Sequence, residues 1–232
     1  MKRSAIPVAI AFLLAVTAIV NPLVAQDSPD NEVKRVNEAT IILEEIMGAS
    51  DKSVPRTIME KAEGIAVFPS MLKGGLVVGA QHGRGILSVR NKKTGGWSSP
   101  AFLTINGGSL GMQIGAQAID LVLVVNGQRG LEQLVKNQFK IGADASVAAG
   151  PVGRDASAST DLQMRAAILS YSRSRGLFAG VTLNGSTIRQ DRDANERFYG
   201  TGYRTGQIVF DGMGGSPETA NAWKAALAKY AR

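Results

Sequence analysis

Apolar positions near the start of the chain recur at helical spacing. Val33, Val36, Thr40, Leu43 and Met47 follow one another at intervals of three and four residues, and charged residues fill most positions between them. This pattern predicts an amphipathic helix over 32–47 that ends at a glycine. A second short helix is expected to open at residue 53, with a proline in its first turn.

The middle of the chain, from Ile65 to Ile188, alternates short apolar runs with glycine-containing breaks. The runs are rich in Val, Ile and Leu, and their length suits strands better than helices. Breaks at 73–75, 94–96 and 106–108 predict hairpin turns, and the pattern over 127–135 predicts a short helix. The runs lie at 65–68, 75–80, 85–89, 101–105, 112–116, 120–125, 166–172 and 177–183.

Helical patterns return after residue 188. Residues 191–199 are charged and mixed, and Ser216 with Pro217 predicts the start of a C-terminal helix whose apolar face carries Trp223 and Leu227. The elements together predict an α+β fold. We expect a curved antiparallel glycine-rich sheet or small barrel of about eight strands, with N-terminal and C-terminal helices packed on it.

Glycines inside the strand-like runs need a reason, because glycine packs nothing and loses much backbone entropy there. Gly79, Gly111, Gly115 and Gly180 are such residues. We expect sharp bends or close packing of a helix on the sheet; approach of a ligand to the bare backbone is the alternative.

The N-terminal residues indicate export. Lys2 and Arg3 precede a short apolar run, followed by a proline and the small residue Ala25, which is typical of a secretory signal peptide. The run is short for a membrane span, which needs about 20 apolar residues. We therefore predict a signal peptide over 1–25, a flexible leader over 26–31 and a single domain over 32–232, in the periplasm or cell envelope. An uncleaved anchor is the alternative.

Charge and cysteine content narrow the partners. The chain has a formal net charge of +7, which falls to +5 without residues 1–25; this favours anionic partners, although a basic surface also serves solubility. Cysteine is absent, so disulfides and cysteine-linked acyl chains are excluded.

The sequence contains no recognisable catalytic apparatus. His82 is the single histidine, and a metal site without cysteine or further histidines would be unusual. Asp191, Asp193 and Asn195 have calcium-loop spacing, but residues 196 and 202 do not match the loop, so a solvated helix face is expected. Phosphate-binding and nucleophile-elbow motifs are missing. We predict a non-enzymatic protein without cofactor or metal; a hydrolase using His82 is a weak alternative.

Basic residues provide the candidate binding groups. Several lie at expected turns of the first hairpins, and others flank a later turn or stand near the start of the first helix. Turns at one end of a sheet could bring them together, and each cation would gain about 1 kcal/mol at an anionic membrane surface. The candidate lipid-binding residues are Lys34, Arg35, Lys73, Arg84, Arg90, Lys92, Lys93, Arg154, Arg173 and Arg175.

Several long strings closely resemble the SYLF domain family, in collinear order over about residues 33 to 200. They are KAEGIAVFPSMLKGG (61–75), GWSSPAF (96–102), GGSLGMQIGAQAIDLVLV (107–124), GADASVAAGPVGRDA (142–156), YSRSRGLFAGVTLNG (171–185) and FYG (198–200). The resemblance implies binding to phosphoinositide-containing membranes, and for some yeast relatives binding and bundling of actin filaments. In a membrane-binding relative an amphipathic N-terminal helix takes part, and residues 32–47 occupy that place here.

Departures from the family pattern limit what is carried over. The chain has no SH3 domain and no cysteine-based zinc finger, and an exported protein would not meet actin in its own cell. The expected partner is an anionic lipid or membrane surface, not nucleic acid. The alternative is an envelope scaffold or stress protein that binds another protein. The 32–47 helix could insert in a membrane, although we favour packing on the sheet.

Overall fold

The computed structural model describes residues 29–49, 53–75, 78–110, 115–144, 146–153, 166–174, 177–178 and 183–232. The expected signal peptide and four residues named above, Gly111, Arg154, Arg175 and Gly180, lie outside these ranges. The helices are α1 (Pro29–Gly48), α2 (Arg56–Glu60), α3 (Gln128–Leu134), α5 (Arg192–Tyr199), α6 (Thr205–Val209), the 3-10 turn η2 (Glu218–Ala220) and α7 (Asn221–Tyr230). The strands are β1 (Gly64–Gly75), β2 (Val78–Val89), β3 (Ala101–Leu110), β4 (Gly115–Val125), β5 (Gln138–Lys140), β6 (Val147–Ala149), β7 (Ile168–Ser174), β8 (Leu177–Phe178) and β9 (Thr187–Gln190).

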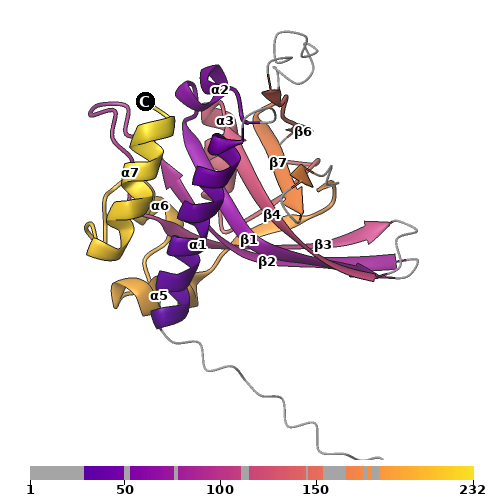
Figure 1. Ribbon diagram of the computed structural model, residues 1–232. Helices are drawn as coiled ribbons and strands as arrows, with labels where there is room; N and C mark the ends of the chain where they lie inside the picture. Colours follow the sequence, from indigo (N-terminus) through magenta and orange to yellow (C-terminus); the bar gives the residue numbers. More distant parts are fainter. Residues whose placement is uncertain are drawn as a thin grey trace, which may run out of the picture.

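The strands form one curved sheet in the order β5-β9-β3-β2-β1-β4-β7-β6, and β8 pairs with β7 (Figure 1). This confirms the expected α+β fold with helices from both ends of the chain packed on the sheet. One detail was wrong: β6 and β7 are parallel. The chain between them, residues 150–167, is longer than the roughly twelve residues that a parallel crossover needs.

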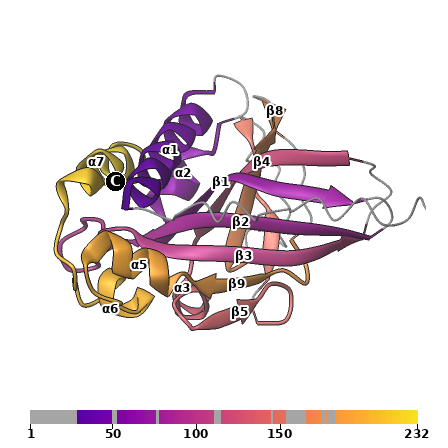
Figure 2. The same cartoon turned by 90° about the horizontal axis from the view of Figure 1, so that it is seen from below.

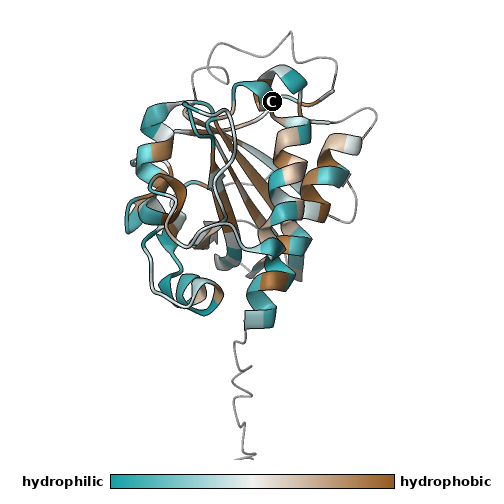
Figure 3. Ribbon diagram, turned by 90° about the vertical axis from the view of Figure 1, so that its left-hand side faces the viewer, coloured by the Kyte–Doolittle hydropathy of each residue, from teal (hydrophilic) through white to brown (hydrophobic). Residues whose placement is uncertain are grey.

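The central strands are buried on both faces. In β1, Ile65 and Val67 belong to the core under α1, α2 and α7, whereas Ala66 and Phe68 belong to the core under α3 and α6. Figure 2 shows the two helical layers on opposite sides of the sheet, and Figure 3 shows the hydrophobic strands enclosed between them. Burial on both faces explains why the strands read as continuous apolar runs without alternation.

Two predicted hairpin turns are instead strand. Gly75 pairs with Gly79 in the last pair of the β1–β2 ladder, and Gly107 pairs with Gln81 inside β2–β3. A Cβ on Gly107 would crowd the Ser186 side chain, so this glycine serves close packing and not a turn. His82, which stands beside Gly83 and Gly85 as a turn residue would, lies within β2. The turn at 94–96 is confirmed, with Gly95 at a φ of 71°.

The helix boundaries differ at both ends of the domain. α1 starts at Pro29, so the last residues of the expected leader are helical; proline suits the first helical position, where its missing N–H is not needed. The C-terminal α-helix begins at Asn221, after the 3-10 turn. Ser216 does not cap it, because Ala220 holds the N-cap position; the Ser216 hydroxyl accepts a hydrogen bond from Lys224 Nζ at 3.0 Å. The predicted short helix over 127–135 is confirmed as α3.

Candidate functional site

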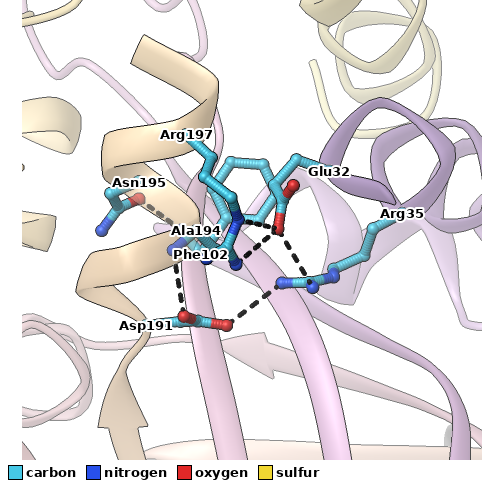
Figure 4. A network of polar contacts seen from close by, with 7 residues as sticks. All are labelled: Glu32, Arg35, Phe102, Asp191, Ala194, Asn195 and Arg197. Carbon is cyan, nitrogen blue, oxygen red and sulfur yellow. Dashed lines mark hydrogen bonds and ion pairs between the residues drawn. The ribbon is translucent and has the colours of Figure 1, made fainter. Parts of the chain in front are cut away.

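A buried polar network attaches α1 to α5 and to the residue before it (Figure 4). Glu32 is fully buried, and its Oε1 accepts a hydrogen bond from Arg197 Nη2 of α5 at 2.9 Å. Arg35 Nη1 donates to Asp191 Oδ2 at 3.3 Å, and Arg35 Nη2 lies 3.6 Å from Glu32 Oε1. These contacts join the first two turns of α1 to both ends of α5, the N-cap residue Asp191 and Arg197 in the last turn, more than 150 residues further along the chain.

Arg35 is therefore part of the fold. Its guanidinium lies 5.3 Å from the centre of the Phe102 ring. Burial lowers the pKa of Arg35, while Asp191 and Glu32 oppose that shift. A side chain held in this way does not reach a membrane while α1 is packed on the sheet. Lys34, one position away, is 73% exposed and lies 3.8 Å from Glu38.

The prediction that Asp191, Asp193 and Asn195 lie on a solvated helix face is wrong for Asp191 and Asn195. Asp191 caps α5 by accepting from Ala194 N at 3.1 Å, besides binding Arg35. Asn195 is buried, and its Oδ1 accepts the backbone N–H of Phe102 at 2.9 Å. The spacing that resembles a calcium loop thus serves capping and strand anchoring.

Beyond α1 the ends of β1 to β4 project from the helical layer (Figure 1), and the sheet face on the α1 side is open there. Arg84 of β2 has the same orientation as Ile86, which packs beneath α1, because residues two apart share a face. Directly opposed residues on neighbouring strands also share a face. Two rows run across β2, β3, β9 and β5: Arg84, Thr104, Arg189 and Gln138; then His82, Asn106, Thr187 and Lys140.

We call these eight residues the open face. Arg84, Arg189 and Lys140 supply three exposed cations, and neither row contains an acidic residue. His82 Nδ1 and Asn106 Oδ1 lie 2.6 Å apart in a hydrogen bond. Leu72 of β1, opposite His82, is 58% exposed and extends the second row with an apolar side chain.

The other candidate cations do not join the open face. Lys73 pairs with Gln81 and Gln117 and so points to the opposite side of the sheet from Leu72. Arg173 forms ion pairs with Glu45 and Asp120 near the other end of α1.

Arg90, Lys92 and Lys93 lie at the far end of the β2–β3 hairpin. Arg90 stacks on Trp97, 4.8 Å from its ring centre, and donates to the Ala62 carbonyl at 2.9 Å. Burial lowers the pKa of Arg90. The described candidates therefore do not converge at one end of the sheet. Of these, Arg84 lies on the open face; its cationic companions, Arg189 and Lys140, come from β9 and β5.

One other sequence feature, a stretch rich in small residues within the 142–156 string, has a structural role. In the small-residue stretch 142–155, Val147–Ala149 forms β6, and a Cβ on Gly150 would overlap the Tyr171 ring. Close packing therefore accounts for that glycine.

Within the described residues, no three His, Asp or Glu side chains lie close enough to hold a metal ion. Over the same part of the chain, none of the helices combines the length and apolar character of a membrane span. The open face offers positive charge, amide and hydroxyl groups on a rigid sheet, which is suited to binding anions.

Comparison with known proteins gives a consistent result. Residues 106–230 match the Ysc84 family model, described as "Las17-binding protein actin regulator". "SH3 domain-containing YSC84-like protein 1" of Homo sapiens is 35% identical over 200 residues, which cover 84% of this chain and 57% of the human protein; the protein of the same name from Rattus norvegicus gives the same values. "LAS seventeen-binding protein 3" of Saccharomyces cerevisiae is 35% identical over 159 residues, covering 67% of this chain and 34% of the yeast protein. The chain thus spans little more than half the length of the animal proteins it matches.

Proposed function

This chain belongs to the Ysc84 (SYLF domain) family, and we propose that it is a non-enzymatic module that binds anionic membrane surfaces through the open face. The supporting observation is the pair of acid-free rows, in which three cations stand on one exposed face beside Leu72.

The proposed affinity is modest. Each cation near an anionic lipid surface contributes about 1 kcal/mol, so three contribute about 3 kcal/mol, or roughly a hundredfold enrichment. Such binding weakens as salt rises, because exposed charges are screened. In this proposal α1 stabilises the part of the sheet on which it packs and does not insert into the membrane, since Arg35 and Glu32 are buried between α1 and the sheet.

Liposome co-sedimentation of residues 26–232 tests this function. We expect pelleting with phosphatidylserine vesicles and little with phosphatidylcholine vesicles. A triple variant, Arg84→Gln, Arg189→Gln and Lys140→Gln, is expected to lose most of the pelleting. The matched control removes three exposed cations elsewhere, Arg56→Gln, Lys61→Gln and Arg129→Gln, and should keep it. Equal losses in both variants would show that net charge and not the open face binds lipid.

The proposed site of action is the cell envelope, which follows from the predicted signal peptide. N-terminal sequencing of the protein from fractionated cells is expected to start at Gln26 in the periplasmic or envelope fraction. A cytoplasmic protein that retains Met1 would contradict the proposal.

A protein partner is the second candidate function. It is favoured by two names: the family model is described as a Las17-binding protein, and the yeast relative is called a LAS seventeen-binding protein. Crosslinking in cells distinguishes the two. One recurrent protein adduct that survives detergent supports the scaffold, whereas adducts that detergent abolishes support the membrane surface.

A further inference from the structure

A second exposed surface lies on the side of the molecule that carries α3 and α6, around the turn that follows α6. Phe210 is 49% exposed and Met213 is 41% exposed. The described part of the chain has four exposed large apolar side chains in all, and two of them stand in this one turn. Clustered exposed apolar groups are typical of interaction sites.

Phe210 borders three neighbouring hollows, which makes it a ridge between them. The first, of about 740 Å³, lies between α6 and the segment linking α3 to β5. The second and third, of about 300 and 360 Å³, lie against the 91–96 turn and the loop after Phe210. An uneven row of recesses fits a chain with side chains better than a flat lipid surface.

The turn that carries the ridge is held in place. Met213 N donates to Gln207 O at 3.0 Å, and Ser99 Oγ donates to Gly215 O at 2.7 Å. Gly212 and Gly214 have φ values of 69° and 85°, a backbone region that side chains rarely adopt. A preformed surface loses little entropy on binding.

The hollows are strongly basic. Six cations line them, Arg90, Lys92, Lys93, Lys136, Arg204 and Lys224, against one carboxylate, Asp211. Arg90 is stacked on Trp97 and Lys92 lies 3.3 Å from Glu63, which leaves four cations to act on a ligand. A partner must therefore be acidic to complement the charge and must carry an apolar group to cover Phe210.

We propose that the hollows around Phe210 bind an extended acidic protein segment, with an apolar side chain placed against Phe210. The first hollow shares Gln138 with the open face, but none of the three open-face cations lines any of these hollows, so the proposal does not depend on membrane binding. Apolar contact with Phe210 provides the anchor, and the cations provide orientation and rapid association.

Fluorescence anisotropy with residues 26–232 tests the proposal. The probe is a short fluorescein-labelled peptide of Asp, Glu and Leu, and its counterpart replaces every Asp and Glu with Asn and Gln. We expect the acidic peptide to bind and the neutral one not to bind. The variant Lys93→Glu with Lys136→Glu should raise the dissociation constant about tenfold, and Phe210→Ser should raise it about fivefold.

The control is the open-face triple variant, which should bind the peptide as the wild type does while losing vesicle pelleting. Equal binding of the acidic and neutral peptides would overturn the peptide site. So would a loss of peptide affinity in the control as large as that in the Lys93→Glu, Lys136→Glu variant. So would a Phe210→Ser variant that binds the peptide unchanged. If the wild type does not bind the peptide and the Lys93→Glu, Lys136→Glu variant no longer pellets with vesicles, this surface binds membranes and not a protein segment.

Discussion

The two ends of the central strands differ in how they are covered. At the packed end, Ile65 to Phe68 of β1 are buried on both faces; at the open end, residues 72–75 of the same strand are exposed or half-buried. The register shifts between these parts, where Ser70 has a φ of 48° and its N–H donates to Asp120 Oδ1 at 3.0 Å. One strand thus contributes to the core before the bulge and to an exposed surface after it. The difference indicates that folding stability resides at the packed end, and that the open end is available for binding.

The sharpest test compares one large side chain from each end. Trp223 of α7 is fully buried on the packed end, and its Nε1 donates to Ser88 Oγ at 2.8 Å. We expect Trp223→Ala to lower the free energy of unfolding by about 3 to 5 kcal/mol. Leu72→Ala, at the open end, should change it by less than about 0.5 kcal/mol. Guanidinium denaturation measures both, and similar losses would show that the ends do not differ.

The next prediction concerns the network that holds α1 on the packed end. Arg35→Met leaves the buried Glu32 carboxylate with one fewer partner, and we expect a loss of about 3 kcal/mol. Lys34→Met, at the exposed neighbouring position, is the matched control and should change stability by less than about 0.5 kcal/mol.

A double variant separates charge from packing. If the cost of Arg35→Met comes from an uncompensated carboxylate, adding Glu32→Gln should recover part of the stability. A double variant less stable than Arg35→Met alone would mean that Glu32 stabilises the fold through Arg197 without help from Arg35.

The packed end was also the part that local sequence patterns could predict. Its apolar runs and helical spacing reflect burial, as in 120–125 and in α1. At the open end the pattern predicts turns at 73–75 and 106–108, because glycine is common in turns, whereas Gly107 is a strand residue packed against Ser186. Arg189 and Lys140 were missed because β9 and β5 are too short to show a clear alternation. The contact of Arg35 with Asp191 joins residues 156 positions apart, a separation that no local pattern reports.

Glycine itself gives the finest comparison between the ends. Gly85 of β2 lies against β1 at the packed end, where a Cβ would overlap the Val67 carbonyl and the Phe68 ring. Gly108 of β3 is exposed at the open end, where the nearest atom to a Cβ would be 4.0 Å away. Gly85→Ala must displace the backbone of the central strand, so we expect a loss of about 2 kcal/mol in unfolding free energy. Gly108→Ala should leave stability unchanged or raise it by about 0.5 kcal/mol, because alanine restricts the unfolded chain. Thermal and guanidinium unfolding of the two variants measure this difference. A Gly108→Ala variant as unstable as Gly85→Ala would mean that the surface around Gly108 is covered in solution, and that this glycine too is needed for close packing.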